Sequence, residues 1–190
     1  SHIPAENRNT PPVPIYQTTA FSFDTVQYAA DLFDLKTSGD IYTRLSNPTT
    51  QVLEERLAGI EGGVGALCVS SGQSASTIAL LNILKAGDEV VASTNMYGGT
   101  INLINVTLQK MGIIVHLVSS DKAEDFEKLI NEKTKCIFAE VLNNPSLSVL
   151  DIEALAKVAH KHSIPLIADN TIPSPYLCQP IKHGADIVVH

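Results

Sequence analysis

Residues 151–169, DIEALAKVAHKHSIPLIAD, contain a helical repeat followed directly by a short apolar run. Apolar residues recur at i, i+3, i+4 and i+7 from Ile152, which places them on one helix face, and Asp151 stands where an N-cap is expected. Pro165–Ala168 lacks the polar/apolar alternation of a half-exposed strand, so we expect a buried strand. This order of helix and strand decides the class of fold, because it is typical of βαβ units.

The same alternation extends along the chain from residue 64. The expected strands are Ala66–Val69, Glu89–Ala92, Ile113–Leu117, Cys136–Glu140, Pro165–Ala168 and Asp186–Val189. Further helices are expected at Ala75–Lys85, Ile101–Met111 and Phe126–Ile130, and from Pro48 with Leu53, Leu57 and Ile60 as its apolar face. We therefore predict an α/β fold, a three-layer sandwich with a mainly parallel central sheet flanked by helices.

The first 46 residues differ from the rest. They contain several prolines, threonines and asparagines and show little periodicity. We expect residues 1–46 to form an extended arm that packs on a neighbouring subunit, although fraying is usual for such a terminus. Residues 47–190 would form a large domain that ends at His190, directly after a strand. Because functional loops follow the carboxyl ends of strands, we expect this domain to be incomplete and the parent protein to be longer.

The composition restricts the class of protein. The 190 residues are 44% hydrophobic and 17% charged, which is typical of a folded chain. Acidic residues outnumber basic ones by 20 to 13, so we expect no nucleic-acid partner. No run approaches the ~18 apolar residues of a membrane span, and no signal-peptide pattern is present. The three cysteines have no paired spacing, so we expect no disulfide framework, no metal site and a cytoplasmic location.

Two nucleotide-binding fingerprints are absent from the sequence. Gly63-Val64-Gly65 begins a G-x-G motif, but the third glycine is missing and the motif precedes a predicted strand. No G-x-x-x-x-G-K-[ST] motif occurs. A nucleotide-dependent oxidoreductase is therefore disfavoured.

The loop Ser70–Ser74 follows a predicted strand and opens a helix. The free N–H groups of a helix N-terminus form an anion site where small residues such as Ser71 and Gly72 permit a close approach. A phosphate would suit this site. The alternative is a Ser/Gly turn that only caps the helix.

Asp169, in the run Asp169-Asn170-Thr171, ends a predicted buried strand. A carboxylate there is costly without a cationic or hydrogen-bonding partner. The next basic residue is Lys182, so a cationic ligand would meet this need. The alternative is an aspartate that caps the following turn.

Three more polar features have both a functional and an ordinary interpretation. Tyr97 stands beside two glycines after a strand and can lie flat over a planar ligand, or it can be a surface tyrosine. Tyr42 and Arg44 are two residues apart on an extended segment and can both meet a phosphate, or Arg44 can simply be solvated. Asn144 follows the strand that ends at Glu140, where an ordinary turn is also expected.

Four of these loops follow separate strands at one edge of the predicted sheet, where α/β folds bind their ligands. Together they offer a phosphate cradle, an aromatic platform, an amide and a carboxylate. A planar phosphorylated ring with a basic nitrogen satisfies all four. Pyridoxal 5′-phosphate (PLP) is such a molecule.

The ordered set of motifs resembles the amino-terminal part of the Cys/Met-metabolism family of PLP-dependent enzymes, which has fold type I. The resemblance extends over essentially the whole chain. The matching stretches are VPIYQTT (13–19), IYTR (41–44) with NPT (47–49), SSGQ (70–73), LN (81–82) with GD (87–88), YGGT (97–100), NP (144–145), DNT (169–171) and HGADIVVH (183–190).

The resemblance implies how the phosphate is bound. Backbone N–H groups of Gly72 and Gln73, beside Ser71, would donate to it. Tyr42 and Arg44 would reach the phosphate of a neighbouring subunit, which requires at least a dimer, and we expect a homotetramer.

The resemblance also implies roles around the ring. Tyr97 would stack on the pyridine ring and act as a catalytic helper in proton transfer. Asn144 would hold the side of the phenolic oxygen. Asp169, followed by Thr171, would keep the ring nitrogen protonated. The family's Schiff-base lysine lies in a Ser-x-Thr-Lys segment, and no lysine in this sequence has that context.

Within the family the likeness is greatest to sulfhydrylases that use O-acetylhomoserine, through Gln73 and Val149–Ala154. It implies γ-replacement on O-acetyl-L-homoserine by sulfide or another thiol, giving L-homocysteine and acetate in methionine biosynthesis. Cystathionine γ-synthase, cystathionine γ-lyase and methionine γ-lyase activities remain alternatives. So does a non-catalytic α/β module that binds a phosphorylated metabolite.

Overall fold

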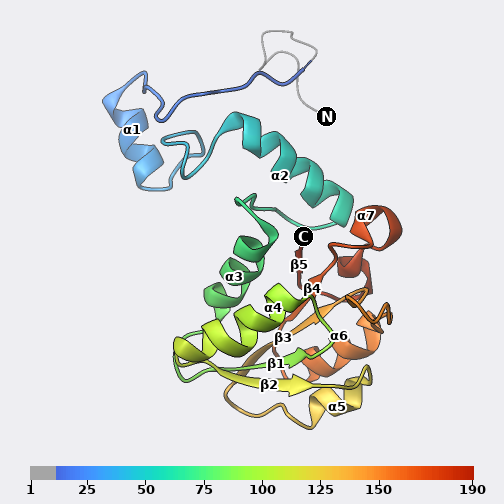
Figure 1. Cartoon of the computed structure of the whole chain (residues 1–190). Coiled ribbons are helices and arrows are strands. Elements are labelled where there is room, and N and C mark those ends of the chain that lie inside the picture. The colour runs from blue at the N-terminus through green and yellow to red at the C-terminus, as the bar shows by residue number, and fades with distance from the viewer. Residues whose placement is uncertain (1–11) are drawn as a thin grey trace. The chain divides into compact units, whose positions relative to one another are not determined.

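A computed structural model describes residues 12–190 of the chain (Figure 1). By their own contacts these residues form two units: residues 12–59 with 63–68, and residues 60–62 with 69–190. The part of the predicted arm before residue 12 lies outside the described residues. The division between arm and domain at residues 46 and 47 stays a prediction.

The first unit contains one helix and most of a second. Helix α1 (Val26–Phe33) begins where the Thr25 hydroxyl accepts a hydrogen bond from the helix backbone. The weak periodicity of the arm did not predict this helix. Helix α2 (Pro48–Glu61) begins at its proline, as predicted. The Asn47 side chain donates to the Tyr16 carbonyl at 2.9 Å, so the start of α2 holds the stretch that precedes α1.

A five-stranded parallel sheet forms the centre of the second unit. Its strands are β1 (Glu89–Ser93), β2 (Ile114–Val118), β3 (Thr134–Glu140), β4 (Leu166–Asp169) and β5 (Ile187–Val189), in the order β2-β1-β3-β4-β5. All four neighbouring pairs are parallel, which confirms the predicted sheet. The carboxyl ends of all five strands therefore point to the same edge.

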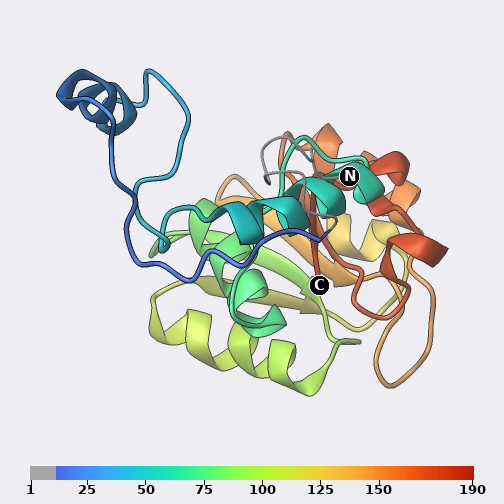
Figure 2. The same cartoon turned by 90° about the horizontal axis from the view of Figure 1, so that it is seen from above.

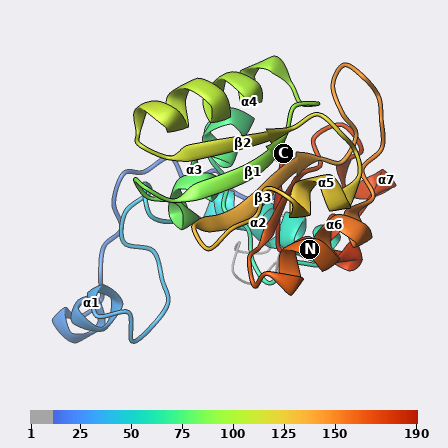
Figure 3. The same cartoon turned by 90° about the horizontal axis from the view of Figure 1, so that it is seen from below.

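Helices cover both faces of this sheet, as Figure 2 and Figure 3 show. One layer contains α3 (Gly72–Ile83), α4 (Gly98–Asn102) and its continuation η1 (Leu103–Leu108), and the other contains α5 (Ala123–Glu127) and α6 (Ile152–Lys161). Two short segments, α7 (Ser174–Leu177) and η2 (Pro180–His183), connect β4 to β5. This arrangement confirms the three-layer α/β fold. No helix among the described residues is long and apolar enough to cross a bilayer.

Successive residues of β3 point into different layers. Ile137 and Ala139 belong to the core cluster beneath α5 and α6, whereas Cys136 and Phe138 belong to the cluster beneath α3 and η1. All four side chains are fully buried. A strand covered on both faces needs apolar residues at every position, which explains the absence of polar alternation in the sequence. The predicted N-cap of α6 is also confirmed, because the Asp151 carboxylate accepts from the Ala154 N–H at 2.9 Å.

Two local expectations were wrong. Residues 66–69 form no strand: they pair with none of the five described strands, and Leu67 is 65% exposed. Met111 is 46% exposed, because it lies in the turn that ends the helix containing η1 and not on the helix itself. On α2, Leu53 and Ile60 are about half exposed and Leu57 is partly buried, and because α2 spans both units its predicted apolar face stays a prediction. An apolar pattern identifies a face but not the partner that would cover it.

The buried thiol of Cys136 provides a test of the core. Burial, with a contribution from the charge of Asp88, raises the pKa of Cys136 to about 12. At pH 8 only about one molecule in 10⁴ would carry the reactive thiolate. We expect Cys136 in the full-length protein to resist iodoacetamide until guanidinium unfolds the chain, as measured by peptide mass mapping. Cys68, which is only partly buried, is the internal comparison. Equal labelling of the two thiols in the native protein would contradict this packing.

Candidate functional site

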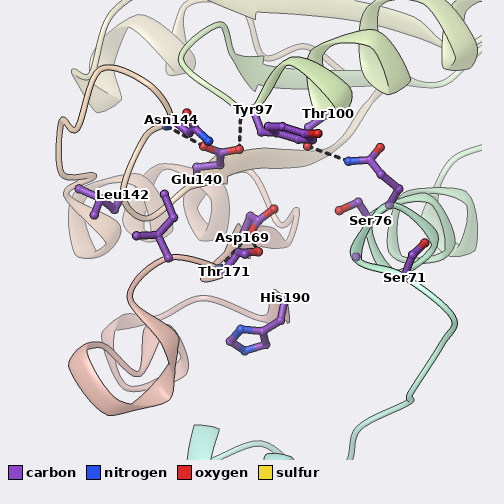
Figure 4. A pocket seen from close by; sticks show the side chains of 13 residues that line it. Ser71, Ser76, Tyr97, Thr100, Glu140, Leu142, Asn144, Asp169, Thr171 and His190 are labelled. Atoms are coloured by element: carbon purple, nitrogen blue, oxygen red, sulfur yellow. Dashed lines mark hydrogen bonds between the residues drawn. The ribbon is translucent and has the colours of Figure 1, made fainter.

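A cavity of about 480 Å³ lies at the carboxyl edge of the sheet (Figure 4). Its volume is in the range of small-molecule sites. The lining residues come from the start of α3 and from the segments that follow β1, β3, β4 and β5: Ser71, Gly72, Gln73, Ser76, Tyr97, Thr100, Glu140, Leu142, Asn144, Asp169, Thr171, Ile172 and His190. The structure thus brings seven of the nine predicted site residues to one cavity.

The N-terminus of α3 presents backbone donors to this cavity. Ser71 has an extended backbone and caps the helix by accepting a hydrogen bond from the Ser74 N–H at 3.1 Å. Among the described residues, no acceptor takes the N–H of Gly72 or Gln73. Two free donors at the start of a 12-residue helix form a site for an anion. The interpretation of this loop as a helix cap is therefore correct, and it is compatible with phosphate binding.

Gly72 allows the helix to approach the last strand closely. A Cβ atom at this position would lie 2.9 Å from the carbonyl oxygen of His190, which is too close for any side chain. The close approach brings the free N–H groups next to the segment that follows β5. Glycine is required here by space and not by backbone strain.

Tyr97 lies on a different side of the cavity from Asp169 (Figure 4). It follows β1 and directly precedes α4, and the residue is 53% exposed. The nearby Gln73 side chain donates to the Thr100 hydroxyl at 3.3 Å, which links α3 to α4 beside the tyrosine. An exposed aromatic ring that lines a cavity offers a face on which a planar ligand can stack.

Asp169 places a carboxylate on the cavity wall without a cationic partner. Its Oδ1 accepts from the backbone N–H of Thr171 at 3.0 Å and from the hydroxyl of the same residue. No ion pair involves Asp169 in the described part of the chain. The turn-capping interpretation is therefore also correct, and the other carboxylate oxygen remains able to meet a cation.

Glu140 is a lining residue that the sequence analysis missed. It ends β3, is 5% exposed, and pairs in register with Asp169 of β4. The pKa of Glu140 is raised overall: burial raises it most, the backbone N–H groups of Tyr97 and Asn144 lower it, and the charge of Asp169 raises it. A charged residue that ends an otherwise apolar strand was the pattern used for Asp169, and the same pattern could have identified Glu140.

Three other polar residues line the cavity and were not predicted for it. Ser76 and Thr100 are buried hydroxyls on α3 and α4. His190 follows β5, and its Nε2 lies 2.8 Å from Glu61 Oε1. The places of Ser76 and Thr100 depend on how the helices pack, which periodicity alone does not reveal, whereas His190 directly follows a predicted strand, the pattern used for Asp169.

Tyr42 and Arg44 do not line the cavity. They belong to the first unit, where the Arg44 guanidinium lies 4.7 Å from the centre of the Tyr42 ring. The expected extended segment was wrong, because residues 43–45 form a turn in which the Leu45 N–H donates to the Tyr42 carbonyl at 2.8 Å. Their predicted contact with the phosphate of a neighbouring subunit stays a prediction.

The donor set of the cavity fits PLP. Two free N–H groups suit a phosphate, the Tyr97 face suits an aromatic ring, and the unpaired Asp169 carboxylate suits a protonated ring nitrogen. The amide side chain of Asn144 lines the same cavity and can meet the ring's phenolic oxygen.

Comparison with known proteins agrees with this chemistry. A sequence profile of the Cys/Met metabolism PLP-dependent enzyme family matches residues 2–190. This chain belongs to that family. PLP is the cofactor of the family, as the groups around the cavity indicate.

Two relatives from the Cys/Met metabolism family show the degree of similarity. The chain is 57% identical over 178 residues to an O-acetyl-L-homoserine sulfhydrylase of Leptospira meyeri, with 94% of this chain and 40% of that protein covered. It is 48% identical over 187 residues to a homocysteine/cysteine synthase of Kluyveromyces lactis, with 98% and 42% covered. The chain therefore spans less than half the length of these curated relatives.

A solved structure confirms the fold of this family member. A protein of Campylobacter jejuni described as an O-acetylhomoserine (thiol)-lyase superposes with a TM-score of 0.94 at 45% identity. The match covers 96% of this chain and 45% of the other. That crystal structure contains N′-pyridoxyl-lysine-5′-monophosphate.

Substitution of Gly72 tests the close approach of α3 to the end of β5. In the full-length apoprotein we expect Gly72→Ala to lower the free energy of unfolding by about 1–3 kcal/mol, because the added Cβ overpacks against a carbonyl oxygen. Thermal and urea unfolding measure this change. Gly98→Ala is the matched control: it also changes the first residue of a helix, but a Cβ there meets no heavy atom within 4 Å. The predicted geometry fails if both variants unfold like the wild type.

Proposed function

We propose that the full-length protein catalyses PLP-dependent γ-replacement on O-acetyl-L-homoserine with sulfide, giving L-homocysteine and acetate in methionine biosynthesis. The names of its relatives support this reaction. The observation that carries the proposal is the cavity that combines an anion site, a stacking face and an unpaired carboxylate. We propose sulfide as the second substrate, with another thiol as the alternative.

The residues at the start of α3 would bind the phosphate. Gly72 and Gln73 would donate their free N–H groups, and the Ser71 hydroxyl lies beside them on the cavity wall. Charge-assisted hydrogen bonds of this kind are stronger than neutral ones. They would therefore fix one end of the ligand and set the direction of its ring.

The residues near the carboxyl ends of β1 and β4 would act on the ring. When bound, PLP withdraws electrons from the substrate, so that the Cα proton becomes acidic and the γ-acetate can leave. Asp169, oriented by Thr171, would hold the proton on the ring nitrogen. Tyr97 would exclude water from one ring face, and its hydroxyl would relay a proton at the reacting carbons. Asn144 would hold the phenolic oxygen.

The proposed enzyme needs groups from outside the described cavity. The Campylobacter jejuni structure holds its pyridoxyl group on a lysine, and we propose that the full-length protein also supplies one. Tyr42 and Arg44 would contribute to the phosphate site of a neighbouring subunit, with residues 1–46 as the arm that reaches it. The assembly would be a dimer that shares active sites, within a homotetramer. We propose a cytoplasmic location, supported by three cysteines that are all free.

Absorbance and turnover of the full-length protein test the proposed function. We expect a visible band from bound PLP that borohydride abolishes, and homocysteine formation from O-acetyl-L-homoserine and sulfide. A panel with cysteine, cystathionine and methionine separates the proposed reaction from those of cystathionine γ-synthase, cystathionine γ-lyase and methionine γ-lyase. A colourless protein that takes up no PLP would instead favour the non-catalytic binding module.

Removal of the Asp169 charge tests its pairing with the ring nitrogen. We expect Asp169→Asn in the full-length enzyme to lower kcat/KM on the order of 10- to 100-fold, because a charged hydrogen bond becomes a neutral one. Asp151→Asn makes the same change at the N-cap of α6, where asparagine caps as well as aspartate. We expect this control to retain wild-type turnover. Equal turnover of the wild type, Asp169→Asn and Asp151→Asn would exclude the pairing of Asp169 with the ring nitrogen.

A further inference from the structure

Glu140 is a buried carboxylate at the edge of the sheet. It is the last residue of β3, which is the middle strand of the five, and it is 5% exposed. Its carboxylate has no cationic partner in ion-pair range within the described residues. A buried carboxylate of this kind is costly, so its hydrogen bonds must account for its presence.

Two backbone N–H groups from different loops share the Glu140 carboxylate. Oε1 accepts from the Tyr97 N–H at 2.7 Å, and Oε2 accepts from the Asn144 N–H at 3.0 Å. Tyr97 belongs to the segment after β1, and Asn144 belongs to the segment after β3. One side chain therefore joins the two segments that carry the stacking ring and the amide of the proposed PLP site (Figure 4).

The two hydrogen bonds favour the ionised form of Glu140, against burial and the charge of Asp169, which raise its pKa. Each oxygen already accepts an N–H group, whereas a protonated carboxyl would need an acceptor for its own O–H. The charged group that faces it is Asp169, at the paired position of β4. In a parallel sheet, paired residues point to the same face. Two carboxylates thus lie together beside the cavity, and a cationic ring would offset the repulsion between them.

We propose that Glu140 is a positioning residue, whose carboxylate holds Tyr97 and Asn144 at the separation that the ring of PLP requires. It acts through these two residues and not by contact with the reacting atoms. Because both acceptor oxygens are used, the two segments cannot shift independently without breaking a hydrogen bond to a buried charge. This inference rests on the proposed PLP site.

The test uses Glu140→Gln in the full-length protein. Glutamine has nearly the same shape, but its NH₂ group donates and cannot accept from a backbone N–H. In the apoprotein we expect hydrogen exchange to become at least about 10-fold faster at the Tyr97 or the Asn144 amide. In the loaded protein we expect weaker visible circular dichroism from the displaced ring. We also expect a Kd for PLP raised on the order of 10-fold.

Glu89→Gln is the matched control. Glu89 is also a nearly buried carboxylate, but it begins β1 at the opposite edge of the sheet, where it accepts from Asn131 Nδ2 at 2.7 Å and lies 2.5 Å from His116 Nε2. These hydrogen bonds, that of Asn131 first, lower the pKa of Glu89, so the carboxylate contributes to folding. We expect this variant to unfold at a lower temperature while its circular dichroism and PLP affinity stay at the wild-type level.

The outcomes separate this inference from the proposed function. Wild-type exchange, circular dichroism and PLP affinity in Glu140→Gln would overturn the positioning role, as would equal spectral changes in the Glu89→Gln control. A wild-type protein that binds no PLP would overturn both the proposed function and the role toward the ring. The amide exchange of the apoprotein would then still show whether the carboxylate holds both segments. If Glu140→Gln does not fold, Glu140→Asp replaces it: the charge is kept but its reach is shortened, and the same losses are expected.

Discussion

Parallel pairing between β3 and β4 places Glu140 beside Asp169, and the pairing of β4 with β5 places Val189 next to the same point. Because every strand of the sheet runs in the same direction, each connection that leaves a carboxyl end begins at one edge. The backbone ladders thus bring residues that are far apart in the sequence to one cavity. The pairing of Glu140 with Asp169 depends on this register, since a one-residue slip turns each side chain of a strand to the opposite face.

The cavity is electrostatically asymmetric. At the α3 side, the first turn of a helix offers two free N–H groups and the positive end of its dipole. At the β3–β4 side, Glu140 and Asp169 supply two carboxylates and no compensating cation from the described residues. A ligand that is negative at one end and positive at the other is complementary to both regions. This polarity selects the direction in which a phosphorylated ring with a basic nitrogen can bind, and it disfavours the reverse orientation.

The sequence predicted the sheet and most of the cavity because both depend on local patterns. Apolar runs without alternation identified strands covered on two faces, and a polar residue directly after such a run marked Asp169. The predicted strand at 66–69 was wrong. A strand forms only where a neighbouring strand can pair with it, and the apolar pattern of one segment does not show whether such a neighbour exists. Glu140 has the same sequence pattern as Asp169 but was missed. Only the structure shows that its carboxylate accepts from the backbone N–H groups of Asn144 and of Tyr97, which lies in a distant segment.

The anion site also depends on how its hydrogen bonds are divided. The Ser71 hydroxyl accepts from the Ser74 N–H, and the Ser71 carbonyl accepts from the Ala75 N–H, so the cap satisfies the later donors of the first turn. The N–H groups of Gly72 and Gln73 are left without acceptors from the described chain. A side chain at position 72 would clash with the His190 carbonyl and push the helix away from β5. Capping and close packing therefore act together. The cap stabilises the start of α3, and Gly72 lets the two free N–H groups of this helix lie at the sheet edge that also carries the carboxylates of β3 and β4.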